Sequence, residues 1–253
     1  MTKTKIALVT GGSRGLGRDM AINLAKKGID VLITYNNNKG AADEVVALLK
    51  SMGRKAKAFQ LDVSNIKLFD RFFEEVTAYL QEEYGNPNFD FLINNAGTGL
   101  YIPFLETTEE QFDEMMNIHI KGVYFLTQKG VNFMNDGGRI INISSGLARF
   151  TLPKSSAYAA MKGAVEVFTR YLAKELAPRK IAANVVAPGA VATDFGSGEN
   201  KTNMEKRKVV SNITALGRVG EPEDIGGVVA FLCTDEAYWI NGQRIEVSGG
   251  MSL

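Results

Sequence analysis

The sequence has very little cysteine and no excess of charge of either sign. Its single cysteine, Cys233, permits no internal disulfide. The neighbours of Cys233 in GGVVAFLCTDE are mostly apolar, which predicts a core cysteine rather than a reactive thiol. The chain contains 29 basic and 28 acidic residues, and this balance argues against a surface for nucleic acid or an anionic membrane. We therefore expect a small-molecule partner.

The sequence is equally poor in histidine and in N-terminal apolar residues. His119 is the only histidine and has no obvious partners for binding a metal, so we expect it to be structural and expect no metal site. The start, MTKTKIALVTGG, passes from two lysines into a short apolar run that ends at glycines. That run is too short for a signal or membrane segment. It predicts a first strand and a cytoplasmic protein.

Short apolar runs alternate with longer amphipathic ones along the chain. The short runs are KIALVT, DVLITY, KAFQLDV, FDFLINN, GRIINIS, IAANVVAP and QRIEVSG. This alternation predicts a doubly wound α/β fold, in which seven largely parallel strands are covered by helices on both faces. No break divides the pattern, so residues 1–253 are expected to form one domain.

A polar segment rich in glycine and lysine, residues 195–217, follows the sixth strand. It could be a plain surface excursion. Ligands of open α/β sheets bind at the carboxyl ends of the strands, however, and this position favours a substrate lid.

A glycine-rich turn, TGGSRGLG, connects the first strand to the first helix. Gly11, Gly15 and Gly17 would allow a tight turn and close approach of a ligand to the backbone. The start of the helix would offer free N–H groups and its positive end to a pyrophosphate. The turn therefore predicts a dinucleotide site, which would also include Ser13, Arg14 and Leu16.

The end of the second strand indicates which dinucleotide binds. NAD sites commonly place an acidic residue there, whereas this chain has Tyr35 and Asn36. Arg14 could pair with a 2′-phosphate, which favours NADP(H) over NAD(H). If Arg14 were only a solvated loop charge, either cofactor would remain possible.

Two further strand ends extend the expected cleft. Asp62 in QLDVS could accept a hydrogen bond from the adenine amino group. In the run NNAG, from Asn94 to Gly97, the small Ala96 would leave room for the nucleoside. Each feature alone could simply belong to a turn. All of them, however, stand at the ends of strands that meet at one edge of a sheet.

Together these motifs resemble the short-chain dehydrogenase/reductase family over essentially the whole chain. The motifs are TGGSRGLG, Asp62-Val63, NNAG, Asn117, Ser145, the YAAMK of Tyr158 to Lys162, Pro188-Gly189 through Thr193, GEPEDI and SGG. The resemblance implies a Rossmann-like seven-stranded parallel sheet, a homotetramer, and hydride transfer between a nicotinamide and a carbonyl or alcohol. It also implies that Ser145, Tyr158, Lys162 and Asn117 are catalytic.

The chemistry of these side chains fits such a reaction. Reduction of a carbonyl leaves charge on oxygen, and the phenol of Tyr158 could supply the proton. Lys162 would lie on the same helical face and is expected to lower the phenol pKa. The hydroxyl of Ser145 could hold the substrate oxygen. The resemblance implies that Asn117 supports a water leading protons from Lys162 to solvent.

The expected pocket for the substrate is apolar. Thr193 and the backbone of Val191 could reach the nicotinamide amide, and Leu147, Phe150, Leu152 and Phe195 are expected to line the pocket. This lining favours ketones or ketoesters, which would be reduced to secondary alcohols.

Two other functions stay open. The resemblance includes 3-oxoacyl-carrier-protein reductases, but Asp136 stands where these carry basic residues, although Arg179 remains basic. A non-catalytic nucleotide-sensing module would keep the glycine turn and tolerate loss of Tyr158 or Lys162, and both are present.

Overall fold

The predicted strands form one parallel sheet. The computed structural model describes residues 4–253. Within that range the sheet has seven strands in the order β3-β2-β1-β4-β5-β6-β7, and every neighbouring pair is parallel. The strands are β1 (Ile6–Val9), β2 (Asp30–Tyr35), β3 (Ala56–Gln60), β4 (Phe89–Asn94), β5 (Met134–Ile143), β6 (Ala182–Pro188) and β7 (Arg244–Val247). The strand order reverses between β1 and β4, which is where open α/β sheets bind ligands. The doubly wound α/β prediction is confirmed.

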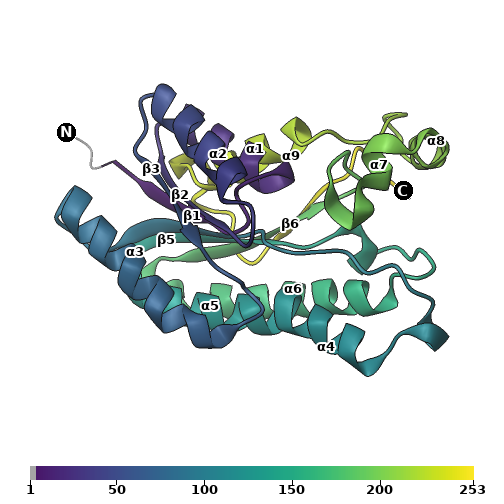
Figure 1. Cartoon of the computed structure of the whole chain (residues 1–253), viewed down its shortest axis with the longest axis horizontal. Helices are drawn as coiled ribbons and strands as arrows, with labels where there is room; N and C mark the ends of the chain where they lie inside the picture. The colour runs from purple at the N-terminus through teal and green to yellow at the C-terminus, as the bar shows by residue number, and fades with distance from the viewer. Residues whose placement is uncertain (1–3) are drawn as a thin grey trace.

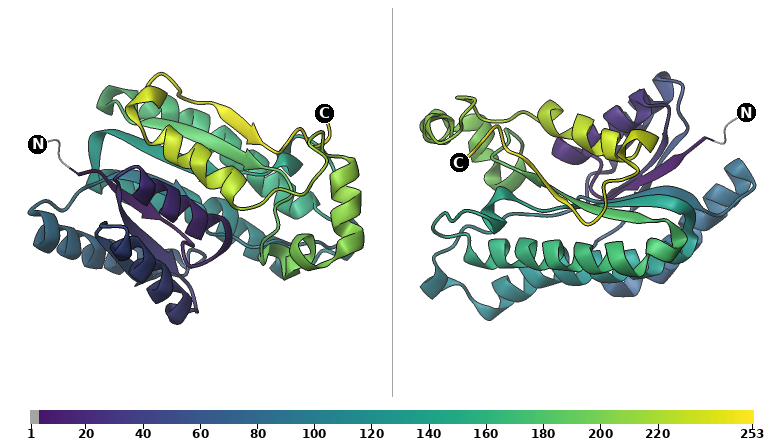
Figure 2. Two further views of the ribbon diagram at one scale, coloured as in Figure 1. Left: turned by 90° about the horizontal axis from the view of Figure 1, so that it is seen from above. Right: turned by 180° about the vertical axis from the view of Figure 1, so that it is seen from behind.

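Helices cover both faces of the sheet (Figure 1). One layer contains α1 (Gly15–Lys26), α2 (Lys39–Ser51) and α9 (Glu223–Leu232). The other contains α3 (Phe69–Tyr84), α5 (Gly122–Gly130) and the long α6 (Ser156–Glu175), which runs beneath the sheet in the right view of Figure 2. Because both faces are covered, β1, β2, β4 and β6 are buried along their whole length and show no alternation of polar and apolar residues.

Each side of the sheet has its own apolar core. Met20, Leu24 and Val229 pack on one side, and Phe69, Phe73 and Leu126 on the other. Cys233 follows α9 and is buried, which confirms it as a core residue. No helix in the described range has the length and apolarity that crossing a bilayer requires.

The helix after β4 is irregular. It begins with α4 (Glu109–Met116), whose first turn is closed by a capping box between Thr108 and Gln111. A π-helical turn, Asn117–Lys121, then leads into α5. Such turns insert an extra residue into the helical repeat and often occur at functional sites.

The expected lid is built mostly from short helices. A 3₁₀ turn (Phe195–Gly198) leads to α7 (Glu199–Thr202) and α8 (Met204–Asn212). An ion pair between Lys206 and Glu199 at 2.6 Å lies within this segment. A second, between Lys201 and Asp194 at 3.0 Å, connects the segment to the residue that precedes it.

Candidate active site

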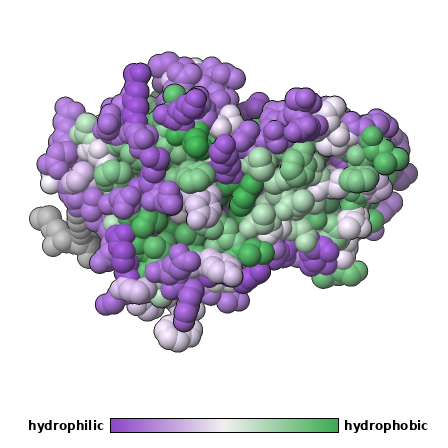
Figure 3. All heavy atoms as spheres, turned by 90° about the horizontal axis from the view of Figure 1, so that it is seen from below, coloured by the Kyte–Doolittle hydropathy of each residue, from purple (hydrophilic) through white to green (hydrophobic). Residues whose placement is uncertain are grey.

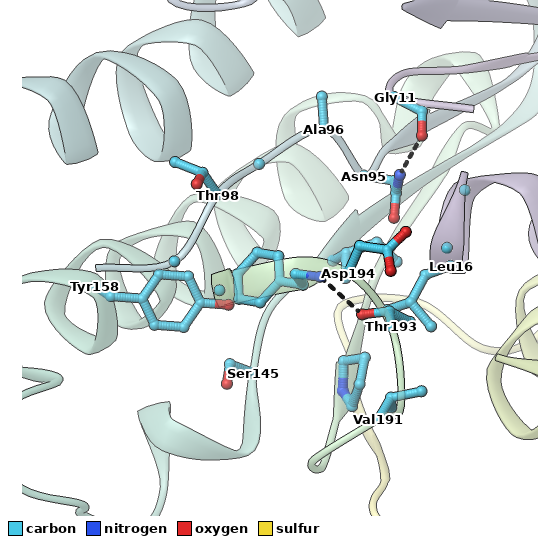
Figure 4. A pocket seen from close by; sticks show the side chains of 18 of the residues that line it. Gly11, Leu16, Asn95, Ala96, Thr98, Ser145, Tyr158, Val191, Thr193 and Asp194 are labelled. Carbon is cyan, nitrogen blue, oxygen red and sulfur yellow. Dashed lines mark hydrogen bonds between the residues drawn. The ribbon is translucent and has the colours of Figure 1, made fainter. Parts of the chain in front are cut away.

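A cavity of about 970 Å³ opens at the carboxyl ends of the strands. The glycine turn and the loop after β4 line one end, and the segments after β5 and β6 line the other. Gly11, Leu16 and Asn95 lie toward the first end, and Tyr158 and Ser145 toward the second (Figure 4). Sites that the sequence scatters over most of the chain therefore share one cavity.

The glycine turn is shaped for close contact with a ligand. At Gly17 a Cβ would lie 2.2 Å from the carbonyl oxygen of Gly11, so no other residue fits. Arg14 precedes α1 as its N-cap, and its side chain makes no capping hydrogen bond. The start of α1 lines the cavity through Gly15, Leu16 and Gly17, which suits a pyrophosphate.

The expected adenosine end has no acidic residue at the tip of β2. Tyr35 and Asn36 line the cavity there, as do Ser13 and Arg14 from the glycine turn. Asp62 and Val63 line it from the loop after β3, where Asp62 accepts hydrogen bonds from the backbone N–H and hydroxyl of Ser64 at 2.9 and 2.7 Å. These residues fit the adenosine part of a nicotinamide dinucleotide.

Asn94 is not among the residues that line this cavity, and its predicted role in cofactor binding stays a prediction. Its side chain is buried on the other side of β4, where Nδ2 donates to Thr127 at 2.9 Å and to Asn142 at 2.8 Å. Asn95 is the residue that reaches the glycine turn, donating to the carbonyls of Thr10 at 2.9 Å and Gly11 at 3.2 Å. Successive side chains of a strand point to opposite faces, and this alternation separates the two asparagines.

The structure brings Ser145, Tyr158 and Lys162 together at the inner end of the cavity. Tyr158 and Lys162 share one face of α6, and their residues are only 6% and 5% exposed. The ammonium of Lys162 donates to the carbonyl of Ile143 at 2.8 Å and lies 5.6 Å from the centroid of the Tyr158 ring. Ser145 lies two residues after Ile143, the last residue of β5.

The pKa of Tyr158 departs from the expectation. Burial raises the phenol pKa above its ordinary value, the nearby Tyr101 adds to this rise, and a hydrogen bond from Ser145 opposes it. Burial also lowers the pKa of Lys162 to about 8. The predicted lowering of the phenol pKa by Lys162 is therefore not seen among the protein's own groups, because desolvation disfavours the charged form of both residues.

Asn117, which the sequence suggests as the fourth catalytic residue, does not line the cavity. It is half-buried and opens the π-helical turn. His119, two residues later, does line the cavity and is fully buried. Its Nε2 lies 2.7 Å from the carbonyl oxygen of Thr98, and its ring meets that of Tyr158 edge to face at a centroid distance of 5.2 Å.

The side expected to bind substrate is largely apolar and aromatic. Leu147, Phe150, Leu152 and Phe195 all line the cavity, as the sequence predicts. The ring of Phe195 lies 5.8 Å from that of Tyr158. The rest of the predicted lining consists of Ala96 and Gly97 after β4, Pro188 at the end of β6, and Gly189, Val191 and Thr193 after β6.

The architecture and this site agree with comparisons to known proteins. A family model described as "Enoyl-(Acyl carrier protein) reductase" matches residues 11–252. Short chain dehydrogenase/reductase AacuN of Aspergillus aculeatus is 36% identical over 256 residues, covering 97% of this chain and 95% of that protein. The chain belongs to the short-chain dehydrogenase/reductase family. Members of this family are oxidoreductases.

Other relatives of this dehydrogenase/reductase are reductases by name, and two solved structures among them are described as catalysing keto-reduction or as a ketoreductase. Hydroxynaphthalene reductase-like protein Arp2 of Metarhizium brunneum is 36% identical over 257 residues, 97% of this chain and 94% of that one. The structure of LugOII, a promiscuous reductase that catalyses keto-reduction in lugdunomycin biosynthesis, is 40% identical with a TM-score of 0.92, covering 98% of each chain. The landomycin C-6 ketoreductase LanV, solved with NADP and rabelomycin, is 38% identical with a TM-score of 0.90, covering 98% of this chain and 96% of that one.

Several lining residues of this dehydrogenase/reductase escape prediction from sequence. They include Asn95, Thr98, Tyr101, His119, Val210 and Met251. Met251 comes from the C-terminal end and Val210 from α8, and no local motif signals that either reaches the cavity. For Asn95 a signal existed, because it stands next to the end of β4 in the quoted NNAG.

Proposed function

We propose that this protein is an NADP(H)-dependent ketone reductase that converts a ketone or ketoester into a secondary alcohol. The observation that carries the proposal is that the half-buried Ser145 and the buried Tyr158 and Lys162 line one end of a cleft whose other end fits a dinucleotide. A nicotinamide, when bound, supplies the hydride for the carbonyl carbon. The protein supplies the proton and holds the oxygen.

The chemistry of each side chain determines its proposed role. Tyr158 keeps its proton because burial raises its pKa, and a protonated phenol is the form that can donate to the developing alkoxide. The Ser145 hydroxyl donates a hydrogen bond to the same oxygen. Lys162 places a positive charge beside the phenol and would hold the nicotinamide ribose, while Thr193 and the backbone of Val191 would hold its carboxamide.

The cavity wall supports aromatic ketones as substrates. Tyr101, Phe150 and Phe195 all place rings in the cavity wall, and the Phe195 ring lies 5.8 Å from that of Tyr158. Flat apolar surfaces of this kind favour stacking with aryl groups. LanV was solved with rabelomycin, and Arp2 is named for hydroxynaphthalene. We therefore infer that a ketone attached to or fused with an aromatic ring is preferred over an aliphatic ketone.

Docking of an acyl carrier protein receives less support. Arg179, the basic residue that remained as a candidate, donates to Asp136 at 2.8 Å and to the carbonyls of Val131 and Met134 at 2.7 and 2.6 Å. Its charge is thus balanced within the chain, which leaves less field for an acidic partner. A 3-oxoacyl chain on carrier protein is still included in the test as the competing substrate.

Tyr158→Phe tests the proposal directly. The variant keeps the ring but lacks the proton donor, so ketone-dependent oxidation of NADPH should fall by about 100-fold or more. Binding of NADPH, followed by its fluorescence, should remain. Tyr238→Phe is the matched control, because Tyr238 is exposed and lies neither in the cavity nor on α4 to α6.

The substrate panel consists of aryl ketones, ketoesters and a 3-oxoacyl carrier protein. Unchanged turnover by Tyr158→Phe would contradict the mechanism. If the wild-type protein binds NADPH but reduces nothing in the panel, the nucleotide-sensing function is favoured instead.

A further inference from the structure

His119 is a fully buried histidine beside Tyr158 for which the proposed chemistry has so far no use. Its ring lies in the cavity wall, 5.2 Å from the Tyr158 ring and nearly perpendicular to it, with an interplanar angle of 88°. The π-helical turn Asn117–Lys121 carries it there. Buried polar groups are normally hydrogen-bonded, so the hydrogen bonds and the charge state of this ring need an explanation.

The hydrogen bonds define the tautomer. Nε2 lies 2.7 Å from the carbonyl oxygen of Thr98, and a carbonyl can only accept, so Nε2 carries the hydrogen. Within residues 4–253 Nδ1 has no hydrogen-bond partner. A charged ring would place a second N–H at this atom with no acceptor for it. The contacts therefore fit a neutral imidazole with a bare Nδ1.

The groups that surround His119 also favour its neutral form. Tyr158 and Lys162 from α6 are the titratable groups that face the ring, and the loop after β4 adds the carbonyl of Thr98. Burial is the largest cause that lowers the pKa of His119, and the positive charge of Lys162 is the second. Although the hydrogen bond to the Thr98 carbonyl opposes them, the pKa is lowered to about 3. His119 thus stays neutral wherever the protein is folded near neutral pH.

The packing shows that the chain makes room for this ring. At Gly97 a Cβ would lie 2.6 Å from Cε1 and 3.2 Å from Nδ1 of His119, so a larger residue at position 97 would displace the imidazole. Gly97 and Thr98 belong to the loop that forms the wall opposite Tyr158. His119 therefore connects this loop to the catalytic tyrosine.

We propose that His119 is a positioning residue for reduction: as a neutral imidazole protonated at Nε2, it holds the loop at Thr98 and the ring of Tyr158 in fixed relation. This role deepens the proposed function and rests on it. Ring contact orients the phenol, and the hydrogen bond to Thr98 keeps the imidazole from rotating.

Nuclear magnetic resonance can test the state of His119 without any substrate. The chain has one histidine, so protein labelled with ¹⁵N-histidine gives a single pair of ring nitrogen signals that need no assignment. We expect one protonated and one unprotonated nitrogen, with the proton at Nε2, unchanged between about pH 5 and pH 9. Titration near the ordinary histidine value, or a proton at Nδ1, would overturn the proposal. This result is independent of whether the protein reduces ketones.

Two substitutions test the effect on the reaction. His119→Phe keeps a ring but lacks the donor to Thr98, and we expect kcat for an aryl ketone to fall by roughly 10- to 100-fold, with KM for NADPH unchanged. His119→Gln places an amide N–H near the position of Nε2 and should recover a substantial part of kcat. Full activity of folded His119→Phe, or no recovery in folded His119→Gln, would refute the positioning role.

Thr127→Val provides the control for a purely structural effect. Thr127 is as buried as His119 and its side chain also makes a hydrogen bond, which it accepts from Asn94, but it lies outside the cavity. Its loss should lower the melting temperature and leave kcat unchanged. If His119→Phe behaves in the same way, His119 is structural only. Absence of ketone reduction in the wild type would instead count against the proposed function.

Discussion

At the scale of single residues, cofactor choice depends on the few side chains that meet the adenosine. Tyr35 and Asn36 stand at the end of β2 without a carboxylate, and Arg14 reaches the same part of the cavity from the glycine turn. A guanidinium can bind a phosphate with two parallel hydrogen bonds. Arg14 would therefore attract the 2′-phosphate of NADP(H), and the end of β2 has no carboxylate that would repel it.

Arg14→Ala should therefore weaken use of NADPH much more than use of NADH. We expect kcat/KM for NADPH to fall by about tenfold or more, the usual effect of losing one charge-assisted hydrogen bond, and kcat/KM for NADH to remain. Arg18→Ala is the matched control, since Arg18 lies one helical turn later, is exposed, and does not line the cavity. Equal kcat/KM values of the wild type for both cofactors would show that the preference for NADP(H) is wrong.

At the scale of elements, one ion pair fixes the substrate wall after β5 to the C-terminal end of the chain. Arg149 donates to both carboxylate oxygens of Glu246 on β7 at 2.7 Å, and to the carbonyls of Met251 at 2.9 Å and Ser252 at 3.2 Å. Arg149, followed by Arg244, lowers the pKa of Glu246 to about 2, so the pair stays charged throughout the neutral range. Met251 thereby becomes part of the cavity wall.

A double-mutant cycle of Arg149→Ala and Glu246→Gln tests this connection. Each substitution should raise KM for the ketone and leave kcat nearly unchanged, because the wall shifts while Tyr158 stays in place. The double variant should be no worse than either single one, with a coupling of about 1 kcal/mol, since Arg149 is partly exposed. Arg218→Ala with Asp224→Asn is the control, a similar two-bond pair outside the cavity. Strictly additive effects would mean that the pair does not hold the wall.

At the scale of the whole molecule, the surface over α4, α5 and α6 is unusually apolar. Figure 3 shows apolar residues gathered over the middle of this face. The exposed side chains include Phe112 on α4, Tyr124 on α5, and Val167 and Tyr171 on α6, the last 63% exposed. Apolar patches of this kind on single chains usually mark interaction surfaces.

We therefore expect the protein to be a homotetramer, which the family resemblance also implies. Its mass by light scattering should be about 110 kDa, four times the 27.6 kDa of one chain. Val167→Glu combined with Tyr171→Glu should give smaller species, because the charges would be desolvated on association. The exposed Trp239, which lies on no part of α4 to α6, serves as the control through Trp239→Glu. A wild-type protein that remains a single chain at micromolar concentration would contradict the expectation.

The sequence by itself determined the fold and about half of the cavity lining. Buried parallel strands are recognisable because they are continuously apolar, and the glycine turn is recognisable because only glycine fits where Gly17 approaches Gly11. Tyr158 and Lys162 could be placed together because α6 is a regular helix, in which residues four apart share a face.

The tertiary structure alone decided the positions that depend on irregular backbone or on distant segments. The π-helical turn adds a residue to the helical repeat, and it turns His119 rather than Asn117 into the cavity wall. Alternation along β4 buries Asn94 and exposes Asn95 to the glycine turn. Met251 is held in the wall by distant segments, because Arg149, about a hundred positions earlier, binds its carbonyl and Thr214 pairs with its backbone. Such placements depend on contacts between segments far apart in the chain, and local periodicity carries no information about them.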